Sequence, residues 1–364
     1  MHVIVFDDGK AELGPMTDLR AAFDIRSGAF TNLERLIARG VQIAGLRVPD
    51  HLADLTRERH PGLKVNVPVP GAVEISGRSP LPDLSSILGE AAANTGEEDG
   101  EWGGNELERP WHIKAARDQC LAFDLALLVK RFDPSRAAKA TGFALARAPT
   151  AVVHPSAIFD TDRGHIVLGD YATVRPGAII VGPAYIGPHS TVLERALIKA
   201  GTAMGPWCKV AGEVGGTIFQ GYANKGHDGH LGDSWVGEWA NLGAGTTNSN
   251  LLNTYGEVIT RARPGMPLER TGEQFFGCIV GDHVKTAICT RIMTGAIIGT
   301  GTMWAATAHI TGCVPAFSWV TDTGTRTFRF DKFMEVTRAA MSRRSITPTP
   351  SYEGRLSARH AATA

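Results

Sequence analysis

A six-residue period dominates the middle of this chain. Between Val152 and Met303 an aliphatic residue followed by glycine recurs, with a small residue further on, in segments such as V-R-P-G-A-I, I-V-G-P-A-Y, L-G-A-G-T-T and I-G-T-G-T-M. This period is longer than that of a hairpin and shorter than that of a helical repeat, and it is typical of a parallel β-helix built from hexapeptides. The 42 glycines suit short strands joined by tight corners.

The length of 364 residues favours two domains. Before the repeats, residues 2–6 and 41–48 read as strands, and residues 30–39 and 110–132 as helices, which predicts an α/β domain. Residues 91–106 are acidic and rich in glycine, as expected of an exposed loop. We expect an α/β domain at 1–148, a β-helix at 149–325, and a C-terminal helix and tail at 326–364, with the helix at 331–344 and the last 20 residues loose.

Charge and cysteine usage exclude several classes of protein. The 37 basic and 37 acidic residues cancel, so nothing favours nucleic acid or a membrane surface, and an anionic ligand must be held locally. The five cysteines are scattered without CxxC spacing, which favours reduced thiols over disulfides or a zinc site. The first residues show no basic, apolar leader, and we expect a cytoplasmic protein.

The repeats are interrupted at residues 212–230 and 246–275, where the hexapeptide register breaks. In a solenoid, insertions leave the coil as loops on one face, and that face commonly binds the ligand. The sequence therefore predicts a ligand site beside these two segments.

One stretch around the first interruption is more specific than the period. It reads H-D-G-H-L-G-D-S-W-V-G-E-W-A-N-L-G-A-G-T-T-N-S-N from His227 to Asn250. It resembles the acetyltransferase core of the GlmU family, the bifunctional enzymes that make UDP-N-acetylglucosamine, in which a histidine precedes L-G-D, an asparagine, G-A-G-T and a further asparagine. The resemblance covers about 90 residues well and the other repeats moderately.

The resemblance implies a left-handed β-helix that forms a homotrimer, with acetyl-CoA in the groove between neighbouring subunits. His227 would be the base that deprotonates an acceptor amine, a role that suits imidazole because it titrates near neutrality. Asn241 and Asn250 would orient substrate and base, and backbone N–H groups near Gly243 and Ala244 would face the thioester carbonyl. Acetyl-CoA would contact Ala244, Gly243 and Thr290.

The chain departs from the family pattern where substrate is bound. His230 stands at the position of the family's tyrosine, and Gly216 at that of a phosphate-binding lysine. Arg175 resembles the family's phosphate-binding arginine, but about 20 more residues separate it from the base. We therefore expect Arg175, Lys225 and His230 to be the substrate-binding residues, with Lys225 in place of the missing charge. The acceptor would be a small molecule, an amino-sugar phosphate or nucleotide-linked amino sugar, whose identity the sequence does not give.

The N-terminal half lacks the family's L-A-A-G-x-G-T-x-M loop. It resembles instead a truncated branch of GlmU-like proteins, related to sugar nucleotidyltransferases, that carry F-D-D-G, an R-x-G segment, here Arg26-Ser27-Gly28, and an R-P-W element, here Arg109-Pro110-Trp111. Mg²⁺ would be needed only if this domain is an active nucleotidyltransferase, with Asp7 and Asp8 as the candidates to hold it. A strand-ending Asp-Asp-Gly is, however, more often a turn.

Several alternatives remain open at this point. The protein is either an acyl-CoA-dependent N-acetyltransferase, a sugar-1-phosphate nucleotidyltransferase whose β-helix mainly trimerises, or a non-catalytic scaffold that binds sugar nucleotides. His227 can be a solvated loop histidine, and Asn241 a left-handed corner residue. A zinc site on a β-helix would require His227 and His230 to approach His283 or His309. The asparagine and G-A-G-T pattern favours acyl transfer and no metal.

Overall fold

The structure is a computed structural model, and it describes residues 2–85, 105–132 and 142–363. Almost all of the expected loop at 91–106 lies outside these residues. The α/β part contains a parallel sheet in the order β3-β2-β1-β4. Its elements are β1 (Val3–Phe6), the 3-10 turn η1 (Ala22–Asp24), α1 (Asn32–Ala38), β2 (Ile43–Arg47), α2 (Asp50–Arg59), β3 (Lys64–Val65), β4 (Val73–Ser76) and α5 (His112–Phe132). The predicted strands and helices of this part are confirmed.

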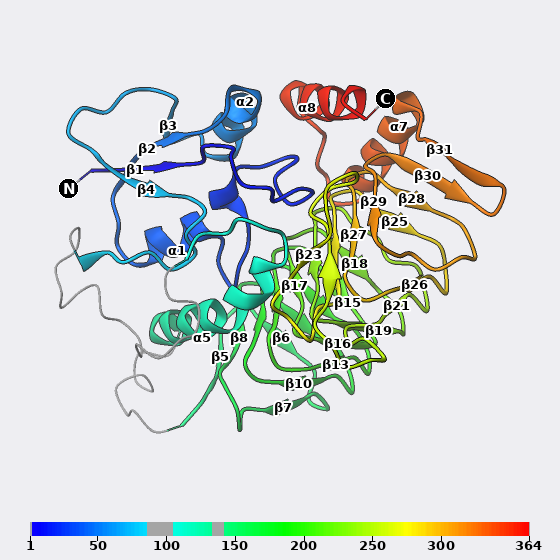
Figure 1. The fold of residues 1–364 in the computed structure, drawn as a ribbon. Helices are drawn as coiled ribbons and strands as arrows, with labels where there is room; N and C mark the ends of the chain where they lie inside the picture. The colour runs from blue at the N-terminus through cyan, green and yellow to red at the C-terminus, as the bar shows by residue number, and fades with distance from the viewer. Residues whose placement is uncertain (1, 86–104, 133–141, 364) are drawn as a thin grey trace.

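The repeats form a three-sided β-helix, so the predicted fold class, an α/β part followed by a left-handed parallel β-helix, is confirmed (Figure 1). Within a face each strand pairs in parallel with the strand one coil away; Ala184, for example, is paired with Thr202, eighteen residues later. Three hexapeptides therefore make one full coil.

We number the three faces by their sheets. Face 1 contains β5 (Leu145–Arg147), β8 (Ile166–Leu168), β11 (Ala184–Ile186), β14 (Thr202–Met204), β17 (Ile218–Phe219), β20 (Trp235–Val236), β24 (Cys278–Val280), β27 (Ala296–Ile298) and β29 (Cys313–Val314). Face 2 contains β6 (Val152–Val153), β9 (Thr173–Val174), β12 (Thr191–Val192), β15 (Lys209–Val210) and β18 (Asn224–Lys225), and beyond them β25 (Lys285–Thr286), β28 (Met303–Trp304) and β30 (Ser318–Thr321). The last strand, β31 (Gly324–Thr327), does not belong to a coil and pairs antiparallel with β30 as a hairpin. Face 3 contains β7 (Ile158–Asp160), β10 (Ile179–Val181), β13 (Leu197–Ile198), β16 (Glu213–Gly215) and β19 (His230–Gly232), and beyond them β21 (Thr247–Asn248) and β26 (Arg291–Ile292).

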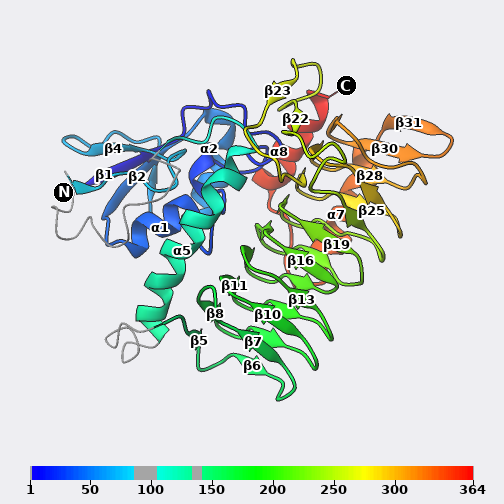
Figure 2. The same ribbon diagram turned by 60° about the horizontal axis from the view of Figure 1, so that its bottom comes forward.

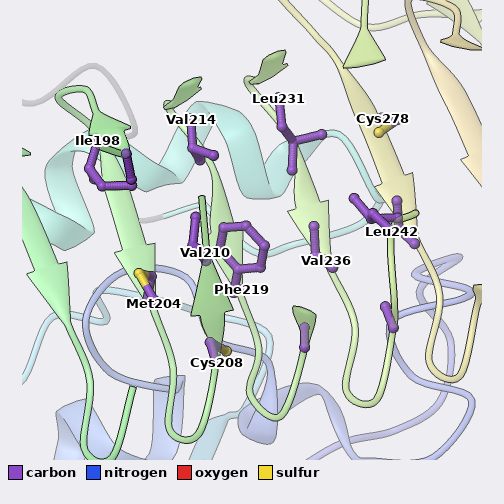
Figure 3. Packing of buried hydrophobic residues seen from close by; sticks show 14 of the residues in the cluster. Ile198, Met204, Cys208, Val210, Val214, Phe219, Leu231, Val236, Leu242 and Cys278 are labelled. Carbon is purple, nitrogen blue, oxygen red and sulfur yellow. The ribbon is translucent and has the colours of Figure 1, made fainter. Parts of the chain in front are cut away.

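Aliphatic side chains fill the interior of the coils. Alternate residues of a strand point to opposite sides, so one or two residues of each short strand face inward, as Ile166 and Leu168 of β8 do. Figure 3 shows Val210, Phe219 and Val236 among the side chains packed there, and all three are buried. Stacked Val, Ile, Leu and Ala account for most of this cluster, as the low aromatic content of the chain predicts.

The outer surface of face 1 is covered by the N-terminal part. Helix α5 contacts β5, β8 and β11, and both ribbon views show it alongside these strands (Figures 1 and 2). Outward residues of face 1, such as Tyr185, Ile218 and Trp235, are buried in one cluster with Cys120 and Leu121 of α5. Face 1 is therefore a docking surface, and any site for a small molecule on the outside of the middle coils must lie on faces 2 and 3 or at their corners.

The two interruptions do not form loops on one face. Residues 212–230 stay in the coil as a shortened turn, because Val210 of β15 is paired with Lys225, only fifteen residues later. Of residues 246–275, β21 remains on face 3, whereas the chain between Leu251 and Phe275 leaves the coil and forms an antiparallel hairpin of β22 (Ile259–Thr260) and β23 (Glu269–Arg270). This hairpin turns toward the N-terminal part, where Arg109 Nε and Glu269 Oε2 are 2.8 Å apart. The prediction that both insertions leave the coil as loops on one face is thus wrong, because only the second one leaves it.

The C-terminal segment contains two helices, α7 (Phe330–Ser342) and α8 (Pro350–Ala361). The helix predicted at 331–344 is confirmed, whereas the loose tail predicted after it is wrong. The Thr349 side chain caps α8, Pro350 stands in its first turn, and Leu356 is fully buried. The first strand of the β-helix, β5, begins at Leu145, and the last strand, β31, ends at Thr327.

Candidate active site at the corner of faces 2 and 3

His227 lies at the corner that connects β18 on face 2 with β19 on face 3. Its side chain is exposed. The next coil stacks on this corner, since the Gly245 N–H donates to the Asp228 carbonyl at 3.0 Å. The coil after that stacks in the same way, with Cys289 N–H donating to the Ala244 carbonyl at 2.6 Å. The predicted base and the predicted acetyl-CoA contact Ala244 therefore lie on consecutive coils of one corner.

Lys225 is buried beneath this corner. It occupies an inward position of β18, paired with Val210 of β15, and it is 1% exposed. Its Nζ donates to the carbonyl oxygens of His227 at 2.9 Å and Ala211 at 3.2 Å. The expectation that Lys225 meets the substrate phosphate is wrong, because the register of the shortened coil turns the side chain inward. Lys225 instead fixes the backbone of the predicted base.

Burial lowers the pKa of Lys225 from its ordinary value of 10.5 to about 8. The folded protein therefore binds fewer protons than the unfolded chain between those two pH values, and the free energy of unfolding rises with pH across that window. We expect Lys225→Met to remove this contribution, on the order of 2–3 kcal/mol. Chemical denaturation measures the free energy of unfolding at pH 8 and at pH 10.5, and the difference between the two values should be smaller in the variant than in the unaltered protein.

The matched control for Lys225→Met is Lys209→Met, on the neighbouring strand β15, where the side chain is exposed. Lys285, whose pKa burial also lowers to about 8, contributes equally to all three proteins. Equal pH dependence in Lys225→Met and the unaltered protein would show that the ammonium group is not buried as described.

Close packing at the same corner leaves no room for a side chain at Gly243. A Cβ atom on Gly243 would lie 2.4 Å from the Ala287 carbonyl oxygen on the next coil. Its N–H donates to Thr286 Oγ1 at 3.0 Å, so the prediction that this N–H faces the thioester carbonyl is wrong. Thr290 is also turned inward: it is buried, and its hydroxyl donates to the Ala287 carbonyl. Of the three predicted acetyl-CoA contacts, Ala244 is the one whose place at the corner still suits that role.

We expect Gly243→Ala to destabilise the protein by about 1–3 kcal/mol, because the added methyl group meets backbone atoms that cannot rotate away. Gly226→Ala, one coil below, is the control. There the nearest atom to an added Cβ is Leu193 Cδ1 at 3.8 Å, an ordinary contact. Urea denaturation measures both variants, and similar midpoints for the two would contradict the close packing at Gly243.

The two predicted asparagines lie on different faces. Asn241 is exposed on face 2, where it forms backbone bridges with Asn224 and Lys285, and it does not take the left-handed corner conformation. Asn250 is half-buried at the far edge of face 3, where its Nδ2 donates to Asp233 Oδ2 at 2.7 Å. A single chain therefore does not bring both asparagines together beside His227.

His230 and Asn250, in contrast, lie close together on face 3. His230 Nε2 and Asn250 Nδ2 are 2.7 and 2.8 Å from the place that a Cβ of Gly232 would occupy. On its other side, His230 Nδ1 is 3.4 Å from Glu213 Oε1, one coil below. Asp233, which binds Asn250, also binds Arg117 of helix α5 at 2.8 Å. A polar chain thus connects face 3 to the N-terminal part.

Sequence reasoning missed Glu213, Asp233 and Arg117 as partners of predicted site residues. Glu213 stands seventeen residues before His230 and is paired with it across β16 and β19. Because seventeen residues is close to the eighteen of a full coil, this spacing could have identified Glu213 as a neighbour of His230. Arg117 comes from a distant helix, and no local pattern points to it.

Arg175 is remote from the base, as the longer spacing suggests. It follows β9, which is separated from β18 by β12 and β15, so it lies about 14 Å from the His227 coil at ~4.8 Å per strand. Its side chain is half exposed, and its Nε is 2.8 Å from Glu194 Oε1. Within one chain, Arg175 and His227 do not share a site.

Asp7 and Asp8, the candidates to hold Mg²⁺, contact other groups of the N-terminal part. Asp7 accepts hydrogen bonds from the backbone N–H groups of Gly9 and Ala22, which explains the Asp-Asp-Gly turn. Asp8 Oδ1 is 3.5 Å from Arg78 Nε. In the part of the chain that the structure describes, no three His, Cys, Asp or Glu residues are grouped to hold a metal ion. His283 is buried against Tyr352 of α8, away from His227.

Proteins named GlmU match parts of this chain. The bifunctional protein GlmU of Cyanothece sp. (strain PCC 7425 / ATCC 29141) is 29% identical over 171 residues, which cover 42% of this chain and 33% of that protein. GlmU of Xylella fastidiosa (strain M23) is 25% identical over 227 residues, covering 56% and 43%. The chain is thus similar, at low identity and over part of its length, to proteins named GlmU. It spans less than half the length of these relatives, and no profile of a known family matches it.

Two solved structures are more distant. Arabidopsis UDP-N-acetylglucosamine acyltransferase is 14% identical, covers 58% of this chain and 88% of its own, and has a TM-score of 0.30. PerB of Caulobacter crescentus in complex with CoA and GDP-perosamine is 13% identical, with coverage of 90% and 96% and a TM-score of 0.19. Among the residues that the structure describes, no helix has the length and apolar character needed to span a membrane.

Proposed function

We propose that this GlmU-like protein is an acyl-CoA-dependent N-acyltransferase that acts on an amino sugar derivative at the corner of faces 2 and 3. One observation carries the proposal: the side chain of His227 is exposed, while its carbonyl is held by the buried ammonium group of Lys225. An imidazole that is open to solvent on a fixed backbone can accept a proton from an approaching amine.

In this reaction the acceptor amine attacks the thioester carbonyl, and His227 takes the proton from the nitrogen. The carbon–sulfur bond then breaks, and CoA leaves as the thiol once it gains a proton. Acetyl-CoA is the donor we expect, and Ala244, on the coil above His227, would border it. His230 and Asn250, which are close together on face 3, are the candidates to hold the acceptor sugar.

The site of a single chain is an open corner. We expect a homotrimer, in which a neighbouring subunit would close the corner into a groove and would bring a second set of face 2 residues, including Asn241, toward the base. A trimeric mass from light scattering would support this arrangement. An active monomer would contradict it.

A thermal-shift panel discriminates among the functions. Acetyl-CoA should raise the melting temperature, because a ligand that binds only the folded state stabilises it. UTP and dTTP with Mg²⁺ are the probes for nucleotidyl transfer, and UDP-sugars alone are the probes for a scaffold. A shift with nucleoside triphosphates and none with acetyl-CoA would overturn the proposal.

A further inference from the structure

Helix α5 contributes one buried side chain to the edge of face 3 at which Asn250 lies. Arg117 Nη1 donates to the Gly216 carbonyl at 2.6 Å and to Asp233 Oδ1 at 2.8 Å. Gly216 and Asp233 follow β16 and β19 directly and both take the left-handed backbone conformation, so they are corner residues on consecutive coils. The α/β part therefore contacts the β-helix beside the face 3 residues that we propose to hold the acceptor.

Two glycines leave the space that these polar side chains occupy. A Cβ atom on Gly216 would lie 2.7 Å from Arg117 Nη1. One coil above, a Cβ atom on Gly232 would lie 2.8 Å from Asn250 Nδ2 and 2.7 Å from His230 Nε2. A side chain at either glycine would displace a member of the polar chain, so the backbone of face 3 is matched to its presence.

The carboxylate of Asp233 determines which end of the Asn250 amide faces it. An ionised carboxylate only accepts hydrogen bonds, whereas an amide has a donor end and an acceptor end. Asn250 Nδ2 donates to Asp233 Oδ2 at 2.7 Å, so Asn250 Oδ1 points away from Asp233. Arg117 binds the other carboxylate oxygen, and the side chains of Arg117 and Asp233 are only 8% and 16% exposed. Because this ion pair is largely shielded from solvent, it can hold the amide in one orientation.

We propose that Arg117 is a positioning residue for acyl transfer: through Asp233 it orients the Asn250 amide so that Oδ1 accepts a hydrogen bond from an N–H or O–H group of the acceptor. The inference rests on the proposed function, in which His230 and Asn250 hold the acceptor. It gives the α/β part a role in acceptor binding that the sequence of that part does not indicate.

The variant Asp233→Asn tests the orientation of the amide. Arg117 can only donate hydrogen bonds, so the carbonyl end of the new amide must face Arg117 and its NH₂ end must face Asn250. Asn250 then has to reverse its own amide to accept from that group. The fold should be retained, because each neighbour keeps a hydrogen bond. KM for the acceptor glucosamine 1-phosphate should rise about 10-fold, the equivalent of about 1.4 kcal/mol, while KM for acetyl-CoA stays unchanged.

Variants of Arg117 test the other end of the polar chain. Arg117→Met should raise KM for the acceptor as Asp233→Asn does, and Arg117→Lys should restore part of the loss, because it keeps a cation beside Asp233. The matched control is Asp118→Ala. Asp118 binds the same guanidinium group, at 2.7 Å from Arg117 Nε, but its side chain is 67% exposed. This control should leave both KM values unchanged.

A double-mutant cycle separates positioning from a general loss of stability. If Arg117 acts through Asn250, Arg117→Met should raise KM for the acceptor no further when Asn250→Ala is already present. Urea denaturation of the same four proteins does not depend on activity. There the two losses of stability should be less than additive, because both variants break the same polar chain.

An unchanged KM for the acceptor in Asp233→Asn, or additive effects in either cycle, would overturn the proposal. An unaltered protein that transfers no acetyl group would contradict the proposed function instead. In that case the stability cycle still decides whether Arg117 holds Asn250: additive losses overturn the link between them, and losses that are less than additive support it.

Discussion

Replacing His227 by alanine should lower acetyl transfer by about 10²- to 10⁴-fold, the usual contribution of a positioned general base. The β-helix should stay folded, because the side chain is exposed. The rate of CoA thiol release from acetyl-CoA, with glucosamine 1-phosphate as acceptor, measures the activity, and the melting temperature measures the fold.

The matched control is His309→Ala, which removes another exposed histidine of the β-helix. It should retain full activity. The competing base is His230, whose ring lies beside Glu213 on face 3. If His230→Ala abolishes transfer while His227→Ala does not, the base has been assigned to the wrong histidine.

Replacing Asp124 by alanine should destabilise the protein by about 3–5 kcal/mol, because it leaves a buried guanidinium group without its partner. Asp124 of α5 and Arg35 of α1 are both fully buried. Arg35 Nε donates to Asp124 Oδ1 at 2.6 Å, and Arg35 Nη2 donates to Asp124 Oδ2 at 2.8 Å. Since α5 also covers face 1, this pair links the α/β part to the helix that docks it on the β-helix.

Urea denaturation gives the loss in the free energy of unfolding. The control is Glu74→Ala, which breaks an exposed pair with Arg47 and should cost far less stability, because solvent screens exposed pairs. The double variant Arg35→Met/Asp124→Leu should recover much of the stability, because it leaves no unpaired charge. A loss in Asp124→Ala as small as that in Glu74→Ala would contradict the described burial.

The β-helix was predictable because its signal is local. Each hexapeptide contains its own strand and corner, so the period alone indicates the coil. Helix α8 was predictable too, although we expected a tail there: Thr349-Pro350 is a recognisable start, and Leu356 is a buried position on the helix.

The inward orientation of Lys225 was not predictable from the period. It depends on the register of the shortened coil, in which Lys225 is paired with Val210 after fifteen residues instead of eighteen. A shift of register by one residue turns a strand residue to the other side. The hydrogen bond of Gly243 was not predictable from the period either. Its N–H donates to Thr286 Oγ1, which lies on a coil that follows a long insertion.

A cavity of about 670 Å³, lined in part by Asp24, could not be predicted from the sequence, for a different reason. Its walls come from segments that are widely separated along the chain, near residues 24–60, 206–239 and 341–352. Each segment is unremarkable by itself, and only the docking of the N-terminal part and the C-terminal helices on the β-helix brings them together.

Hydrogen exchange followed by mass spectrometry, with and without acetyl-CoA, tests the location of the acyl-transfer site most directly. We predict slower exchange on addition of acetyl-CoA in peptides that contain residues 226–229 and 243–246, at the corner of faces 2 and 3, and no change around α2 and residues 346–349. Protection confined to the cavity segments, or no protection at the corner with saturating acetyl-CoA, would contradict the assignment.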